Sequence, residues 1–406
     1  MTARNYSWCL VGVLWVVALL NYIDRQVIFS VFPLLSTDLK LSNVELGLLS
    51  SVFLWTYGVL SPISGFLADR FGRSRLITIS LLVWSAVTLA TGFASNFGQL
   101  IAARALMGIS EACYLPAALG KITEYHGTGS RSLAVGVHQT GLFVGMILGG
   151  SVGGWAGQNY GWRMPFLVLG AIGIAYFAVV LLFFRNEPAA AEIQQQGAQR
   201  SFFSAITELF RLPGFFVMFT VFAATSIANW LVYTWMPLYI FERFHVSLAE
   251  AGFTATFYFQ IASFGGILAG GWLADRLNSR TAKGGLYLQS AGVLLASAFL
   301  FLLAGTDSRL VLIAGLLAYG VGRGFYECNT MPVFCQIAPE ELRSTGYGIF
   351  NFGGCVAGGI VAGLAGRFKD SLGLSGAFQI AACIMLLSGF LLLTLRTKPN
   401  RAHFSL

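Results

Sequence analysis

Charged residues are scarce in this chain, and their scarcity excludes most soluble proteins. Only 10% of the 406 residues are Asp, Glu, Lys or Arg, whereas an ordinary soluble domain carries about 25%. Hydrophobic residues make up 56%, and the mean hydropathy is +0.72. A soluble globular domain is thereby excluded, and the composition is typical of a protein that crosses a membrane many times.

Sequence signals of catalysis and of cofactor binding are also missing. The chain has no nucleotide-binding loop of the Walker type, no His and Cys cluster with metal-ligand spacing, and no nucleophile elbow. Its six cysteines all fall in apolar segments, where we expect them to act as small packing residues. We therefore expect no enzyme activity, no metal and no cofactor, so any transport would draw on an ion gradient.

Long apolar segments account for most of what is present. About 20 helical residues cross the hydrocarbon core of a bilayer, and open strands cannot satisfy their backbone groups in lipid. The first segment is too long for the apolar core of a cleavable signal peptide. The sequence therefore predicts an all-α membrane protein with twelve transmembrane helices, at approximately 8–32, 45–67, 76–95, 98–121, 131–155, 164–185, 213–240, 249–273, 284–304, 309–335, 343–366 and 375–396.

The basic residues predict the orientation. With the N-terminus inside, sixteen of the 25 Lys and Arg residues flank the inner side and six the outer side, while Arg25, Arg104 and Arg323 are intramembrane. Because positive charge accumulates on cytoplasmic loops, both termini are expected in the cytoplasm. The net charge of +8 is then a topology signal. We expect a lipid bilayer as the surroundings, in a cell or bacterial inner membrane, and no nucleic-acid partner.

Two sequence motifs recur with almost the same period. Gly65-Phe66-Leu67-Ala68-Asp69-Arg70 returns 206 residues later at 271–276, and Arg131-Ser132-Leu133-Ala134-Val135-Gly136 returns 212 residues later at 343–348. Matched halves of six spans are typical of parallel membrane repeats. We predict two pseudo-symmetric six-helix bundles: an N-terminal bundle at 1–185, a cytoplasmic linker at 186–212 and a C-terminal bundle at 213–406.

Two charged residues in the first apolar segment need partners on other helices. Asp24 and Arg25 are adjacent, so they project about 100° apart on a helix and pair poorly with each other. A charge near the middle of a membrane helix costs at least ~2.5–3.5 kcal/mol. One interpretation is a structural ion pair between helices. The other is an anion-binding site with a proton or ion relay beside it.

The signature motifs resemble those of a known family. Gly65-x-x-x-Asp69-Arg70-x-Gly72-Arg73-x-Arg75 resembles the signature loop of the major facilitator superfamily, and Arg104-x-x-x-Gly108 resembles its fourth-helix motif. Within that superfamily, Asn21-Tyr22-x-Asp24-Arg25 together with Arg104 and Glu111 resembles two groups. The first is the anion:cation symporter family, with galactonate, hexuronate and sialic-acid carriers. The second is the Spinster-like family, linked to lysolipids.

The pattern from Leu106 to Ala118 and the run Gly161-Trp162-Arg163-x-x-Phe166 favour the symporter family. The fifth predicted span, 131–155, lacks the Gly-Pro pair of the usual antiporter motif, which favours symport. That resemblance implies that Arg25 binds the substrate carboxylate, that Asp24 and Glu111 exchange protons, and that Arg104 couples them. The chain departs from family members in helix ten, where Arg323 and Glu327 add a second Arg and a second Glu.

We predict three groups of functional residues. The substrate-binding group is Arg25, Tyr22, Tyr57, Gln139, Tyr233, Arg323, Tyr326 and Asn351. The proton-coupling group is Asp24, Arg104, Glu111 and Glu327. The gating group is Asp69, Arg70, Arg131, Asp275, Arg276 and Arg343, with Asp69 and Asp275 pairing with basic residues such as Arg131 and Arg343 when the outside gate is open. His138 is interpreted as a structural histidine, with a proton relay as the alternative.

These patterns predict a monomeric secondary transporter that carries a small organic anion, such as a sugar acid or another monocarboxylate, together with protons by alternating access. The alternative is a Spinster-like transporter of a lysolipid or related amphiphile. A non-transporting sensor is a third interpretation. A closed polar cavity favours the sugar acid, and a lateral apolar opening favours the lipid.

Overall fold

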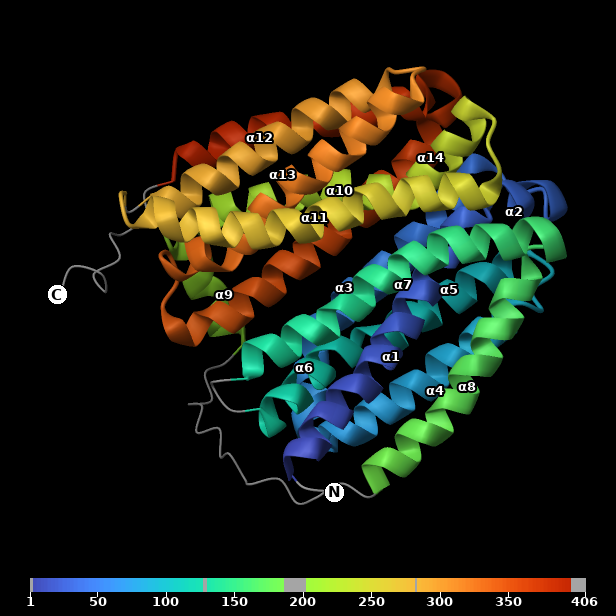
Figure 1. Cartoon of the computed structure of the whole chain (residues 1–406), viewed down its shortest axis with the longest axis horizontal. Helices are drawn as coiled ribbons and strands as arrows, with labels where there is room; N and C mark the ends of the chain where they lie inside the picture. The colour runs from blue at the N-terminus through green and yellow to red at the C-terminus, as the bar shows by residue number, and fades with distance from the viewer. Residues whose placement is uncertain (1–2, 127–129, 186–201, 282, 396–406) are drawn as a thin grey trace. The chain divides into compact units, whose positions relative to one another are not determined.

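The computed structural model describes residues 3–126, 130–185, 202–281 and 283–395. Within these residues it contains fourteen α-helices (Figure 1). The chain folds as two compact units. Unit 1 comprises Met1–Gly197 and Ile240–Thr256, and unit 2 comprises Ala198–Tyr239 and Phe257–Leu406. The domain boundaries predicted from sequence, at 185 and 213, stay a prediction, and residues 186–201 of the linker lie outside the described residues.

The first eight helices belong to unit 1. They are α1 (Ala3–Ser30), α2 (Phe32–Asp38), α3 (Asn43–Phe71), α4 (Arg73–Thr91), α5 (Phe97–Ala112), α6 (Tyr114–Tyr125), α7 (Arg131–Tyr160) and α8 (Arg163–Arg185). The other six are α9 (Phe202–Arg211), α10 (Phe215–Phe244), α11 (Leu248–Asn278), α12 (Gly284–Ala304), α13 (Arg309–Cys335) and α14 (Glu340–Leu393).

Eleven helical stretches of the described residues are long and apolar enough to cross a membrane, and the last of them holds two crossings. That stretch, Thr345–Leu393, has 49 residues. A straight helix of this length would span roughly 70 Å, more than twice the hydrocarbon core. Its backbone leaves the helical region at Gly373, where φ is +66°. The break falls between the two spans predicted at 343–366 and 375–396, so the twelve predicted crossings are confirmed.

Local sequence explains how several helices begin and break. Ser42 and Glu45 form a reciprocal capping box at the start of α3. The fourth predicted span divides into α5 and α6 next to Cys113. Pro116 explains the division, because it offers no N–H to the carbonyl of Ala112. Gly72 joins α3 to α4 at a φ of +86°, a conformation that glycine adopts without strain.

Glycines allow α1 and α7 of unit 1 to pack closely, side by side (Figure 1). A Cβ atom on Gly141, Gly145 or Gly149 would lie 2.8, 2.7 or 2.8 Å from backbone oxygens of α1. In unit 2, a Cβ on Gly354 would lie 2.5 Å from the Ser226 hydroxyl of α10. At these positions the absence of a side chain permits close helix packing. It fixes α1, the helix that carries Asp24 and Arg25.

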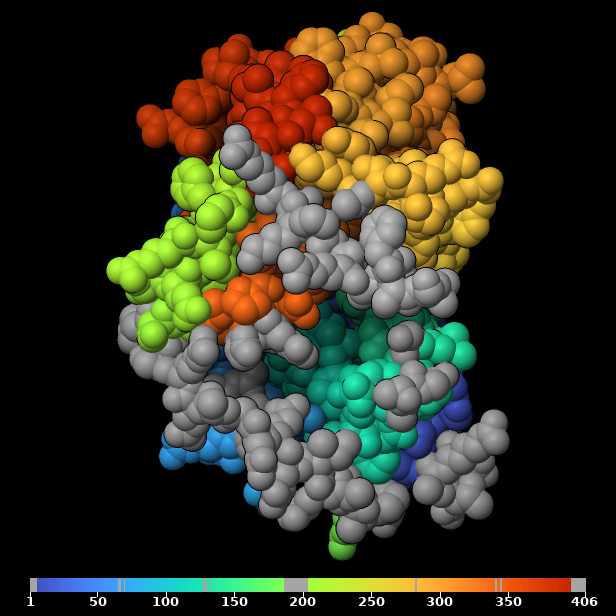
Figure 2. Space-filling model, turned by 90° about the vertical axis from the view of Figure 1, so that its left-hand side faces the viewer, coloured from blue at the N-terminus to red at the C-terminus, as the bar shows by residue number. Residues whose placement is uncertain are grey.

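Two short helices were not predicted. Helix α2 follows the first span and has Pro33 in its first turn, where a proline stabilises a helix start. Helix α9 lies in the segment predicted to be linker. Its Ala205 and Leu209 are buried, and a Cβ on Gly346 of α14 would lie 3.2 Å from Leu209. In Figure 2, α9 is the yellow-green segment beside the orange start of α14 at one end of unit 2.

Candidate functional site

A buried ion pair joins α1 to α5 inside unit 1. The Arg25 side chain donates from Nη2 to Oε2 of Glu111 at 2.7 Å and from Nε to the same oxygen at 3.1 Å. Arg25 is 7% exposed and Glu111 is 1% exposed. The second oxygen, Oε1 of Glu111, accepts no hydrogen bond from the described residues, and the Asn21 side chain interacts with the carboxylate. The helix-one arginine predicted to bind a carboxylate therefore already holds one.

Three aromatic rings surround the Arg25 guanidinium. Its Cζ atom lies 4.6 Å from the ring centroid of Tyr22, 4.9 Å from that of Phe53 and 5.0 Å from that of Tyr57. Such rings attract a cation through their negative faces and exclude water from it. Arg25, Tyr22 and Tyr57 were predicted to lie together and do so, whereas Phe53 was missed.

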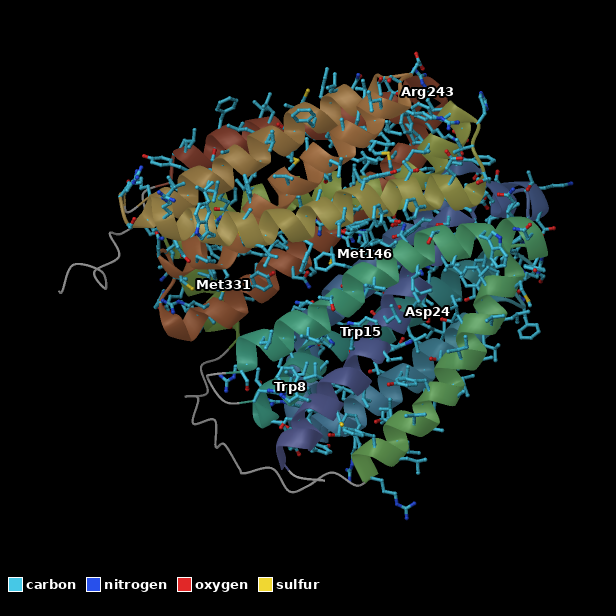
Figure 3. The ribbon with its side chains drawn as sticks, viewed as in Figure 1. Trp8, Trp15, Asp24, Met146, Arg243 and Met331 are labelled. Carbon is cyan, nitrogen blue, oxygen red and sulfur yellow. The ribbon has the colours of Figure 1, made fainter. Side chains whose placement is uncertain are left out.

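Asp24 points to a different neighbour. Its Oδ2 accepts a hydrogen bond of 3.1 Å from the Thr88 hydroxyl on α4. Both residues are buried, and Oδ1 of Asp24 has no hydrogen-bond partner within the described part of the chain. Figure 3 shows Asp24 on α1, farther along the helix than Trp8 and Trp15. The two adjacent charges of helix one thus find separate partners, as the 100° spacing predicts.

Arg104 lies in the same unit and contacts the ring of Phe53. Its Nε donates to the Leu49 carbonyl at 3.2 Å, and its Nη1 contacts the Met107 sulfur at 3.1 Å. Its Cζ lies 4.4 Å from the Phe53 centroid. Arg104 is 1% exposed and forms no ion pair with a described residue, yet it interacts electrostatically with Asp24 and Glu111.

The charges of this cluster balance. With Asp24 and Glu111 ionised, they match the two guanidinium groups of Arg25 and Arg104. In a medium of low dielectric constant an uncompensated charge is expensive, so the neutral sum stabilises the cluster. A further anion would leave it negative by one charge, and a proton on either carboxylate would restore the balance. Anion binding and proton binding at this cluster should therefore favour each other.

Unit 2 contains a second buried arginine, at the position that repeats Glu111. Arg323 on α13 donates to Oε1 of Glu327 from Nε at 2.8 Å and from Nη2 at 2.7 Å. Its Nη1 donates to Gln260 of α11 at 3.0 Å. The Tyr233 and Phe259 centroids lie 5.4 and 5.7 Å from its Cζ. Arg323, Glu327 and Tyr233 are therefore brought together, and the Glu327 side chain is 32% exposed.

The remaining predicted binding residues are more scattered. Tyr326 is buried on α13 and interacts with Thr225 of α10. Gln139 on α7 and Asn351 on α14 are both half-buried. Tyr326 also interacts electrostatically with Glu327, the ion-pair partner of Arg323.

The predicted gating residues make several contacts in this structure, and their pairing in the outward-open state stays a prediction. Arg131 donates to the carbonyls of His126 and Thr123, each at 3.4 Å. Arg343 donates to the carbonyls of Ala338 and Cys335, each at 3.2 Å. Asp275 and Arg276 are exposed at the end of α11. Arg70 is exposed too, and nothing is described of the Asp69 side chain.

His138 has the contacts of a structural histidine. It is fully buried, and its Nε2 lies 2.9 Å from the Tyr114 hydroxyl, which donates to the Leu14 carbonyl at 2.8 Å. A tyrosine has one hydroxyl proton, so a proton on Nε2 of the neutral imidazole completes the chain of donors. These bonds connect α7, α6 and α1.

Sequence reasoning missed three members of the two clusters: Phe53, Thr88 and Phe259. Thr88 carries no motif of its own. The repeat contained a signal for Phe53, because Phe53 and Phe259 are 206 residues apart, the offset of the loop motif. Both phenylalanines lie next to a buried arginine.

Comparison with known proteins adds a family to this geometry. The sequence profile described as Major Facilitator Superfamily matches residues 14–363. A probable galactarate/D-glucarate transporter of Escherichia coli strain K12 is 25% identical over 94% of this chain and 92% of its own length. A D-galactonate transporter of Escherichia coli O6:H1 is 24% identical, covering 92% of each chain.

Among solved structures, a bacterial homologue of the human lysosomal transporter Spinster, inward-facing and occupied, superimposes with a TM-score of 0.76. The two chains are 20% identical, and the match covers 96% of this chain and 95% of the other. At this identity the likeness shows the fold alone. The predicted resemblance to the major facilitator superfamily is confirmed: sugar acid transporters are among the sequence relatives, and the Spinster homologue shares the fold.

Proposed function

Because the chain belongs to the major facilitator superfamily, a family of membrane transporters, we propose that it is a secondary transporter that moves a sugar acid anion together with protons by alternating access. The observation that carries this proposal is the Arg25–Glu111 pair, in which a buried guanidinium holds one oxygen of a carboxylate inside an aromatic cage. The names of the relatives support the substrate class.

Substrate and Glu111 compete for Arg25 in this mechanism. A substrate carboxylate binds an arginine best through two parallel hydrogen bonds, and Arg25 offers Nε and Nη2 to one Glu111 oxygen. Protonation of Glu111 weakens its hold on these donors, which frees them for the substrate. The substrate anion and the proton then enter together, and the cluster keeps its charge balance.

Asp24 is the second proton carrier in this proposal, and Arg104 couples the two acids. Arg104 interacts electrostatically with both Asp24 and Glu111 while it is held by the Leu49 carbonyl. A proton that leaves one acid thereby strengthens the attraction of Arg104 for that acid. Through Arg104, each carboxylate responds to the charge of the other.

Unit 2 supplies further polar groups. Arg323 repeats the arrangement of Arg25, with a carboxylate on Nε and Nη2 and aromatic rings nearby. We propose that Arg323 and Tyr233 bind the substrate, with Gln139, Tyr326 and Asn351 as additional hydrogen-bonding side chains, and that Glu327 takes part in proton coupling. Asp69, Arg70, Arg131, Asp275, Arg276 and Arg343 remain the proposed gating residues.

The proposed surroundings follow from the sequence. The protein is a multi-pass membrane protein, and we propose that it lies in the cell or bacterial inner membrane as a monomer with both termini in the cytoplasm. The basic residues on the inner flanks support this orientation.

Transport assays in proteoliposomes test the function directly. Labelled galactarate, glucarate, galactonate and glucuronate would be offered with and without an inward proton gradient. Accumulation of a sugar acid above its external concentration, abolished by a protonophore, is the expected result. Uptake that is the same with and without the proton gradient would contradict symport. Transfer of a labelled lysolipid in place of every sugar acid would favour the Spinster-like alternative.

A further inference from the structure

Thr88 differs from the neighbouring threonines in what its hydroxyl contacts. A threonine in a membrane helix commonly donates to the carbonyl three or four residues earlier in its own helix. On α4, Thr78 donates to the Ser74 carbonyl and Thr91 to the Val87 carbonyl, at 2.7 and 2.8 Å. Thr88 instead donates across to Asp24 of α1. Its hydroxyl is thus directed at a carboxylate rather than at its own backbone.

From this contact we infer that Thr88 is a positioning residue that sets the proton affinity of Asp24, an inference that rests on the proposed function for its role in coupling. Thr88 and Asp24 are 0% and 2% exposed, so no bulk water competes for the bond. A hydroxyl that donates to a carboxylate favours the ionised form, because a protonated carboxyl is a weaker acceptor. The bond makes Asp24 release its proton more readily than burial alone would allow.

The other groups near Asp24 do not replace this donor. Glu111 and Arg104 on α5 interact with it electrostatically. Helix α7 faces α1 with Gly145 and Gly149 at this level. Tyr114 of α6 and Tyr176 of α8 donate to the carbonyls of Leu14 and Val13, in the N-terminal half of α1. Among the described residues, Thr88 is therefore the hydrogen-bond donor to the Asp24 carboxylate.

The consequence for transport is that net proton-driven uptake and substrate exchange should respond differently to the loss of the Thr88 hydroxyl. A carrier that binds a proton on one side of the membrane must release it on the other before it can reset. Without the Thr88 hydroxyl, Asp24 should still bind its proton but release it less readily. Net proton-driven uptake should then slow near neutral pH, while exchange of substrate for substrate continues.

The decisive experiment compares Thr88→Val, Thr88→Ser and Thr91→Val in purified protein. Thr88→Val keeps the shape and removes the hydroxyl, Thr88→Ser keeps the hydroxyl, and Thr91→Val removes a hydroxyl that serves its own helix. The readout is an infrared titration of the protonated carboxyl band that Asp24→Asn abolishes. We expect its midpoint to move about one pH unit upward in Thr88→Val and to stay in place in the other two.

Two results would overturn the inference: an unmoved midpoint in Thr88→Val, or an equal shift in Thr91→Val. If Thr88→Val does not fold, Thr88→Ala serves the same comparison. Transport is measured in parallel, where the pH profile of uptake should move by the same amount and exchange should change less than twofold. Because the infrared titration needs no substrate, a moved midpoint with no sugar acid uptake would contradict the proposed function and leave the assignment of Thr88 standing.

Discussion

Both nitrogens that Arg25 offers to Glu111 converge on one carboxylate oxygen, and the other oxygen of Glu111 accepts nothing from the described residues. The pair is therefore not the two-by-two arrangement that makes arginine–carboxylate pairs strongest. A substrate carboxylate that uses both of its oxygens would bind Arg25 with better geometry than Glu111 does. This difference gives the substrate an advantage over the internal carboxylate.

Arg25→Lys tests the geometry of that contact. The substitution keeps the positive charge and loses the planar fork, so it removes one of two parallel hydrogen bonds and the stacking on Tyr22 and Phe53. We expect substrate affinity to fall about ten- to a hundredfold, since a charged hydrogen bond contributes roughly 1.5–3 kcal/mol. Isothermal titration calorimetry with the transported sugar acid measures the loss. Arg211→Lys, at an exposed position on α9, is the matched control, and unchanged affinity in Arg25→Lys would remove Arg25 from the binding site.

Much of this architecture could be predicted from the sequence. The twelve crossings follow from apolar length, and Asp24, Arg25, Arg104 and Glu111 stand out because charges are rare in apolar segments. The register between helices could not be predicted. Thr88 is one of several threonines in its helix, and only the packing of α1 against its neighbours brings its hydroxyl to Asp24.

Helix α9 was missed for a different reason. The polar residues around positions 186–200 are typical of a linker. The linker predicted at 186–212 also includes the amphipathic pattern that forms α9. The contacts of Arg131 and Arg343 could not be predicted from charge alone. Their motif predicts a partner of opposite charge, but the carbonyls at the ends of α6 and α13 attract a guanidinium through the helix dipole as well.

Phe53 separates the two arginines of unit 1, and its replacement should affect both. In Phe53→Leu the contacts of the ring with Arg25 and Arg104, at 4.9 and 4.4 Å, are lost. Each desolvated contact of this kind contributes up to about 2 kcal/mol, so we expect a clear drop in melting temperature and several-fold weaker substrate binding. Phe166→Leu, buried elsewhere in the unit, should lower the melting temperature without weakening binding. Equal binding losses in both variants would show that the ring acts only by filling space.

Arg131 and Arg343 should act alike when they are replaced. Each binds two carbonyls at positions related by the 212-residue repeat, His126 with Ala338 and Thr123 with Cys335. Arg131→Gln and Arg343→Gln should each lower stability by about 1–3 kcal/mol through the loss of a charged group at a helix C-terminus. Chemical unfolding in detergent measures both, and a large effect at only one site would contradict the shared role.

The proposed latch has a separate test. Asp69→Asn should change the ratio of inward-facing to outward-facing protein, measured by distances between spin labels, and should change the transport rate with it. Asp275→Asn is the comparison at the repeat position in unit 2. If neither variant changes the populations or the rate, the two aspartates do not gate the carrier.

The end of unit 1 that carries Asp38 should resist mild acid. Asp38 accepts a hydrogen bond from the Trp162 indole at 2.8 Å and pairs with Arg163 at 2.6 Å. The Trp162 hydrogen bond, followed by that of Arg163, lowers the pKa of the Asp38 carboxyl below its ordinary value, about 3.9. A lowered pKa means that the contribution to stability is complete above the ordinary pKa and is lost only as the pH falls through the lowered value. The difference in tryptophan fluorescence between the wild-type protein and Asp38→Asn should therefore stay constant from about pH 8 to pH 5. A change in that difference within this range would show that the contacts of Asp38 with Trp162 and Arg163 break in mild acid.

Glu111→Gln separates proton coupling from anion binding. Gln is nearly isosteric and always neutral, so it mimics the protonated carboxyl and leaves the Arg25 donors free for substrate. We expect exchange of labelled against unlabelled substrate to continue at a rate within about threefold of the wild type, whereas uphill uptake driven by a pH gradient should fall by at least about tenfold, since one of the two acids can no longer return its proton. Both modes are measured in the same proteoliposomes.

The control for Glu111→Gln is Glu124→Gln. Glu124 pairs with Arg73 and Lys121 at the end of α6, away from the buried cluster, and its side chain is 25% exposed. Glu124→Gln should leave the ratio of uphill uptake to exchange unchanged, because it removes the same charge as Glu111→Gln without contacting Arg25.

If Glu111→Gln kept its proton-driven accumulation, the coupling proton would have to reside on Asp24 or on Glu327. Asp24→Asn and Glu327→Gln in the same two assays would identify which. If it lost exchange along with uphill uptake, Glu111 would be needed for binding itself, and its competition with substrate for Arg25 would be contradicted.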